Sequence, residues 1–136
     1  HRLHLVHLAV EDDFRLRASD VEFKMPRPSY TIDTLTYLRE KYPQHEFSII
    51  MGSDSFQNLP RWKNFELLIK DYPFIIYKRN GFEVTDTYGA RTTVLDAPML
   101  NISATEIRNN IKSNKTIRYL VPEKVREEVE QNSYYK

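Results

Sequence analysis

Short apolar runs that follow segments with helical spacing restrict the folds open to this chain. Residues 47–51 and 74–77 are apolar almost throughout and are bounded by glycine or proline. Such runs are typical of strands buried on both faces of a parallel sheet. Apolar residues recur at helical spacing over 32–42 and 65–69, just before each run. The sequence therefore predicts an α/β fold, in which helices cover both faces of a parallel sheet.

The same alternation continues toward both ends of the chain. Residues 3–10 have a helical apolar face, whereas 14–18 alternate apolar with basic residues and predict a strand that can continue to Phe23. A further short strand is expected at 92–95. Helices are expected from Ser103 onward and again after Pro122.

The helix expected to begin at Ser103 opens with residues suited to binding phosphate. Ser103 and Glu106 have the spacing of a capping box. The free N–H groups and positive dipole end of such a helix favour an anion, and Ser103, Thr105 and Arg108 can add donors. An ordinary capped helix explains the same residues. The spacing alone leaves both interpretations open.

Further candidates follow the two expected central strands. Gly52 and Asp54 come directly after the first, where ligands of open parallel sheets bind. Gly52 allows close backbone approach, and Asp54 can accept hydrogen bonds from ribose hydroxyls or merely cap the next turn. Lys78 and Arg79 follow the second strand. They can neutralise a phosphate or remain in water, and we favour ligand contact for them.

Five segments, taken in their order along the chain, resemble the bacterial nicotinate mononucleotide adenylyltransferases. The resemblance extends from Arg2 to Tyr135, which is nearly the whole chain. Several motifs in register are far more specific than any one of them. The segments read PSYTIDTL at 28–35, GSDS at 52–55, LPRW at 59–62, ISATEIR at 102–108 and RYLVPEKV at 118–125.

The resemblance implies a nucleotidylyltransferase of Rossmann-like fold. Such an enzyme transfers an adenylyl group from ATP, accompanied by Mg²⁺, to nicotinate mononucleotide, giving nicotinate adenine dinucleotide and pyrophosphate in NAD biosynthesis. On the ATP side it implies Asp54, Ile102, Ser103, Thr105 and Arg108. On the nicotinate mononucleotide side it implies Tyr30, Thr31, Gly52, Trp62 and Arg79.

Trp62 and the pair Tyr30 and Thr31 have physical reasons to contact the acceptor. The sole tryptophan lies in a polar loop, where it either anchors into the core or stacks on a planar ring, and the resemblance favours stacking on the pyridine. Tyr30 and Thr31 begin a helix, so their amides and the Thr31 hydroxyl can meet a carboxylate. A carboxylate suits nicotinate rather than nicotinamide. A catalytically inactive binding module, or a related enzyme with a phosphopantetheine or nicotinamide mononucleotide acceptor, remains an alternative.

One motif of the family has no match in this sequence. The family carries a GxFxPxHxGH segment whose two histidines stabilise the phosphates, and His1, His4 and His7 lack its glycine, phenylalanine and proline. We therefore expect residues 1–136 to form a single nucleotidylyltransferase domain that is incomplete at its N-terminus, without its first strand, loop and helix. We expect no catalytic residue in this chain, and no activity from it alone.

Composition narrows the remaining classes. The 20 basic and 19 acidic residues give a net charge of +1, so no nucleic-acid partner is expected. The chain has no cysteine, hence no disulfide or thiolate metal site. His1, His4 and His7 could offer two metal ligands on one helix face, but no third ligand type is adjacent, so we favour surface or packing roles for them. No apolar run is long enough to span a bilayer. We expect a cytoplasmic enzyme without a resident metal; a homo-oligomer is possible.

Overall fold

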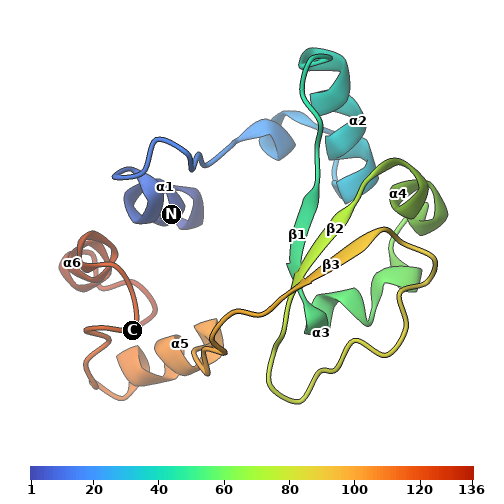
Figure 1. Cartoon of the computed structure of the whole chain (residues 1–136). Coiled ribbons are helices and arrows are strands. Elements are labelled where there is room, and N and C mark those ends of the chain that lie inside the picture. Colours follow the sequence, from blue (N-terminus) through green and yellow to red (C-terminus); the bar gives the residue numbers. More distant parts are fainter. The chain divides into compact units, whose positions relative to one another are not determined.

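The computed structural model describes residues 1–136, which divide into two compact units (Figure 1). Unit 1 combines His1–Asp20 with Ile102–Lys136, and unit 2 is the continuous segment Val21–Asn101. Each unit has its own hydrophobic core. The two are therefore described separately.

Unit 2 is built on a parallel three-stranded sheet in the order β1, β2, β3. The strands are β1 (Ile49–Gly52), β2 (Phe74–Tyr77) and β3 (Thr92–Leu95). In the register of the sheet, Ile49 lies opposite Phe74, which lies opposite Thr92. The parallel sheet predicted from the apolar runs is confirmed.

The helices of unit 2 pack on the face of the sheet where the alternating strand residues are buried. They are α2 (Thr31–Lys41), the short α3 (Ser53–Phe56) and α4 (Phe65–Asp71). One 3₁₀ turn, Val21–Lys24, precedes α2, and a second, Leu59–Arg61, lies between α3 and α4. The shared core consists of Ile32, Leu35, Met51, Phe56, Leu59, Leu68, Tyr72, Phe74 and Ile76.

The strand side chains on the opposite face remain exposed within unit 2. Ile50 is 67% exposed and Tyr77 is 39% exposed, although both alternate with buried neighbours. The period of two along each strand explains this difference, because successive side chains point to opposite faces.

Unit 1 is helical and contains α1 (Arg2–Val10), α5 (Ala104–Lys112) and α6 (Glu123–Gln131). Its core is formed by Ile111, Ile117, Val125 and Val129. Just after α5 and its C-cap residue Ser113, Asn114 has a left-handed φ of 54°, and the Lys115 amide donates to the Asn110 carbonyl at 2.8 Å. No helix in either unit combines the length and the apolar character needed to cross a membrane.

The strand predicted over 14–18 is wrong. Phe14 is 97% exposed and Leu16 is 55% exposed, and the Asp13 carboxylate accepts hydrogen bonds from both the backbone amide and the guanidinium of Arg15. That pairing holds the chain in a local turn. The alternation of apolar and basic residues had no neighbouring strand to pair with, and Val21–Lys24 beyond it form a 3₁₀ turn.

Candidate substrate-binding site

A cleft of about 310 Å³ lies at the N-terminus of α2. Tyr30 is the N-cap residue, with φ −120° and ψ 147°, and no side chain caps the helix. Trp62 comes from the end of the second 3₁₀ turn and is half-buried against the core. Residues around the cleft are Ser29, Tyr30, Thr31, Arg61, Trp62, Lys63 and Leu68. The structure thus brings together the three residues, Tyr30, Thr31 and Trp62, that the sequence suggested for one half of the ligand.

Two basic residues of this cleft were not predicted from the sequence. Lys63 Nζ lies 2.9 Å from Asp33 Oδ2 and 4.8 Å from the centre of the Tyr30 ring. Arg61 lines the same cleft. The available signal was their position on either side of Trp62, but the contact of Lys63 with Asp33 links residues 30 positions apart.

A second group of predicted residues adjoins the carboxyl ends of β1 and β2. The buried Ser53 Oγ accepts a hydrogen bond from the Arg79 amide at 2.8 Å, which ties the two strand ends together. A Cβ added to Gly52 would lie 2.5 Å from Asp54 Oδ1, 3.1 Å from Arg79 Cγ and 3.2 Å from Tyr77 Cζ. Since the φ of Gly52 is −76°, close approach rather than backbone strain is what favours glycine here.

The N-terminus of α5 carries the remaining candidates, in unit 1. Ser103 is the N-cap residue as predicted, and its Oγ accepts a hydrogen bond from the Glu106 amide at 3.1 Å. Arg108 Nη2 donates to Thr105 Oγ1 at 3.4 Å, and Ile102 is half-buried just before the helix. The Ser103 hydroxyl accepts in this arrangement, so its own proton remains available to a ligand.

Two of the N-terminal histidines contact α6 or the residues just after it, in the same unit. His1 Nδ1 lies 2.9 Å from the Tyr134 hydroxyl, and His4 Nε2 lies 3.3 Å from Glu128 Oε1. The structure contains no group of three or more histidine or carboxylate side chains that could hold a metal ion. His1 and His4 thus make packing contacts within unit 1.

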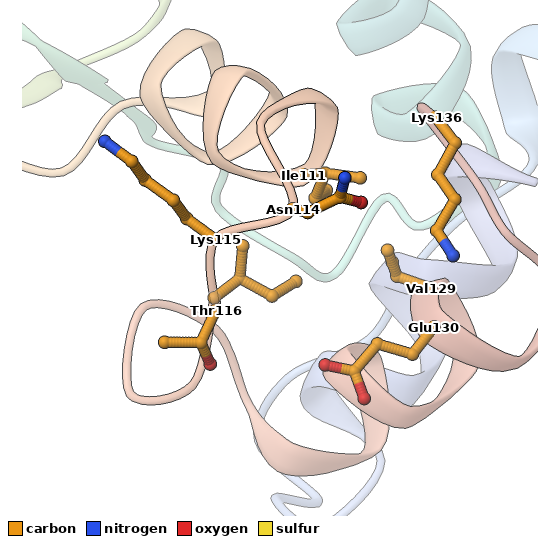
Figure 2. A pocket seen from close by; sticks show the side chains of 8 residues that line it. Ile111, Asn114, Lys115, Thr116, Val129, Glu130 and Lys136 are labelled. Atoms are coloured by element: carbon orange, nitrogen blue, oxygen red, sulfur yellow. The ribbon is translucent and has the colours of Figure 1, made fainter.

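A separate cavity of about 270 Å³ lies in unit 1 at the C-terminal end of α5 (Figure 2). Its lining is Ile111, Asn114, Lys115, Thr116, Ile117, Val129, Glu130 and Lys136. None of the residues predicted to bind ATP or its acceptor lines this cavity. It is distinct from the Ser103 end of the same helix.

Comparison with known proteins identifies the family. Residues 1–110 match the family model described as cytidylyltransferase-like. A probable nicotinate-nucleotide adenylyltransferase of Flavobacterium johnsoniae is 44% identical over 138 residues, covering 99% of this chain and 72% of the relative. The chain belongs to the nicotinate-nucleotide adenylyltransferase family. Another member of this family, from Exiguobacterium sibiricum, is 40% identical over 98% of the chain and 71% of its own length.

A solved adenylyltransferase shares the fold. The Plasmodium falciparum nicotinic acid mononucleotide adenylyltransferase complexed with APC superposes with a TM-score of 0.80 at 19% sequence identity, covering 99% of this chain and 74% of that one. The nucleotidylyltransferase fold class predicted from the sequence is confirmed. Nicotinate-nucleotide adenylyltransferases are transferases, so the predicted enzyme class is confirmed as well.

Proposed function

We propose that this protein transfers the adenylyl group of ATP to nicotinate mononucleotide, giving nicotinate adenine dinucleotide and pyrophosphate in NAD biosynthesis. The observation that carries the proposal is the 44% identity to a probable nicotinate-nucleotide adenylyltransferase across 99% of the chain. The cleft at the start of α2 supports it, because it combines a helix N-terminus with an aromatic platform.

The nicotinate half of the acceptor fits the α2 cleft. A helix of 11 residues whose N-cap side chain makes no capping bond presents amide N–H groups to a carboxylate. Trp62 offers a ring face for the pyridine at the side of the same cleft. We assign Tyr30, Thr31 and Trp62 to the nicotinate ring. Gly52 and Arg79, at the ends of β1 and β2, are assigned to the rest of nicotinate mononucleotide.

The ATP half uses two further groups of residues. Ser103, Thr105 and Arg108, with Ile102 before them, surround the first turn of α5, where the dipole and a guanidinium favour phosphate. We assign Asp54, in the first turn of α3, to the ribose hydroxyls. Substitution of each residue tests the role that we propose for it.

The reaction needs alignment and charge stabilisation rather than a covalent enzyme intermediate. A phosphate oxygen of nicotinate mononucleotide attacks the α-phosphorus of ATP, the bond from that phosphorus to the bridging oxygen breaks, and pyrophosphate leaves. Nucleotidyltransferases generally use a divalent metal ion, and we propose Mg²⁺. The chain has no cluster of carboxylates or histidines for a metal, so we expect the ion to enter bound to the phosphates of ATP.

We further propose that units 1 and 2 belong to one nucleotidylyltransferase domain. The cytidylyltransferase-like match supports this, because it spans residues 1–110 and so includes parts of both units. We place the reaction in the cytoplasm, where ATP is available.

Acceptor choice tests the proposed function. The full-length gene product is assayed with ATP and, in turn, nicotinate mononucleotide, nicotinamide mononucleotide and phosphopantetheine. We expect the highest kcat/KM with nicotinate mononucleotide, because an anion gains from the α2 terminus. Equal turnover of the acid and the amide, or a preference for phosphopantetheine, would contradict this assignment.

A further inference from the structure

We infer that Lys63 makes the cleft selective for an acceptor whose pyridine ring carries a carboxylate, because Lys63 neutralises Asp33. This inference rests on the proposed function and names the residue pair that sets the preference for the acid over its amide. The Lys63–Asp33 pair sets the charge of the cleft, whereas the backbone amides of Tyr30 and Thr31 offer hydrogen bonds to the ligand.

The two charges meet at the start of α2. Asp33 lies in the first turn of the helix, and its carboxylate accepts a hydrogen bond from the Lys63 ammonium at 2.9 Å. Lys63 also lines the cleft. The ammonium lies 4.8 Å from the centre of the Tyr30 ring, so a cation–π contact holds it at the same end of the helix.

A carboxylate in the first turn opposes the proposed ligand. It favours the helix itself, because a negative charge complements the positive dipole end. However, it repels a second carboxylate that binds the N–H groups of that same end, and the helix rise of about 1.5 Å per residue keeps the two charges close. The Lys63 ammonium removes this repulsion. With Arg61 also lining the cleft, one positive charge is left in excess.

The pair is exposed enough to matter for a ligand rather than for folding. The side chains of Lys63 and Asp33 are 44% and 43% exposed. Ion pairs at such exposure add little to stability. A charge beside the ring carboxylate of the ligand changes binding selectively, because a neutral carboxamide at the same position has no net charge to attract or repel.

The test replaces Lys63→Met, which keeps an apolar stem of similar length. We expect kcat/KM for nicotinate mononucleotide to fall about tenfold, mainly through KM, while the value for nicotinamide mononucleotide changes less than about twofold. The double variant Lys63→Met with Asp33→Asn is expected to recover most of the lost preference. Raising the ionic strength is expected to reduce the difference in kcat/KM for nicotinate mononucleotide between the wild type and Lys63→Met, because salt screens the charges.

Lys70→Met on α4 is the matched control, because Lys70 is exposed and does not line the cleft. An unchanged ratio of acid to amide in Lys63→Met would overturn the inference. So would an equal loss with both acceptors, which indicates altered packing. Failure of the double variant to recover would make Lys63 a direct ligand rather than a neutralising residue.

Equilibrium binding separates this inference from the proposed function. If the wild-type protein converts neither acceptor, the proposed function fails. Calorimetric binding of nicotinate mononucleotide and its amide to the same variants still tests the charge pair. A loss confined to the acid supports the inference, and absent or equal binding of the two ligands to the wild type contradicts it.

Discussion

Helices α2 and α5 both begin at proposed ligand sites, but they begin in different ways. At α5 the Ser103 hydroxyl accepts a hydrogen bond from the Glu106 amide, so the helix caps itself. At α2 the N-cap residue is Tyr30, and no side chain caps the helix. A helix end that is capped by its own side chain needs donors from neighbouring residues to bind a ligand. An uncapped end leaves its amide donors free for a partner from outside the helix.

The difference fits the ligands that we assign to the two ends. A phosphate carries enough charge to bind a capped end through added donors such as Thr105 and Arg108. A carboxylate on a flat ring needs the amides themselves and a surface for the ring. The surface at α2 comes from Trp62, far away in the sequence. We therefore expect substitutions at the two ends to affect different substrates.

The largest effect on the acceptor is expected from Trp62→Ala. Loss of ring stacking at α2 should cost about 1–3 kcal/mol, which raises KM for nicotinate mononucleotide roughly 5- to 150-fold and leaves KM for ATP nearly unchanged. Trp62→Phe keeps an aromatic face and should lose much less. Steady-state kinetics with each substrate varied in turn measures this. Because Trp62 also packs against the core, melting temperatures are recorded for both variants. A large drop in melting temperature with unaltered acceptor binding would make Trp62 a core residue only.

Arg108→Ala tests the other end. Removing a charge-assisted contact should cost about 1.5–3 kcal/mol and raise KM for ATP at least tenfold, with little change for the acceptor. Lys112→Ala, in the last turn of the same helix, is the matched control because it removes a positive charge far from the N-terminus. If both variants have the same ATP kinetics, Arg108 does not belong to the site.

A designed cap at α2 tests the comparison directly. Tyr30 has the extended backbone of an N-cap residue, so Tyr30→Ser should supply the missing capping oxygen. We expect the free energy of unfolding to be about 1 kcal/mol higher for Tyr30→Ser than for Tyr30→Ala. Acceptor binding should be weaker for the serine variant, because its hydroxyl occupies an amide that the ligand needs. Chemical denaturation and calorimetry measure the two quantities. Equal binding by both variants would show that the free amides of α2 do not hold the acceptor.

Local signals predicted much of this fold. The strands at 74–77 and 92–95 match β2 and β3, and the first strand, predicted over 47–51, is found at Ile49–Gly52. The start of α5 at Ser103 was readable because capping depends on residues three apart. These features depend on short-range chemistry and on runs that suit a buried parallel strand.

Contacts between distant residues could not be predicted. Nothing in the sequence indicates that Lys63 meets Asp33, or that the Arg79 amide donates to Ser53 Oγ across 26 positions. The strand wrongly predicted at 14–18 has the same cause. Alternation of apolar and polar residues is a local pattern, and it does not determine whether a neighbouring strand is present to pair with. Site geometry depends on which chain segments meet, and periodicity does not encode that.

The smallest effect concerns α6. Like α2, this helix has no side-chain cap, because its N-cap residue is Pro122. In its first turn lies Glu123, whose carboxylate accepts hydrogen bonds from the Arg126 guanidinium, the closer at 2.5 Å. We expect Glu123 to act as the anion that this uncapped helix end favours. At α2, by contrast, we propose that a carboxylate of the acceptor binds the free amides.

The pH dependence of stability follows from that contact. Hydrogen bonding to Arg126 holds the pKa of Glu123 below its ordinary value. A depressed pKa in the folded state stabilises the fold above the unfolded pKa of about 4.3, and this contribution is lost as the pH falls through the folded pKa. The group is exposed, so its contribution to the change in melting temperature between pH 7 and pH 3 should be small. It should shrink further in Arg126→Gln, and a pH dependence identical to that of the wild type would remove the ion pair from α6 stability. Acceptor binding at pH 7 should be the same in both proteins, because Glu123 already provides the negative charge at the N-terminus of α6 and the substrate is not needed there.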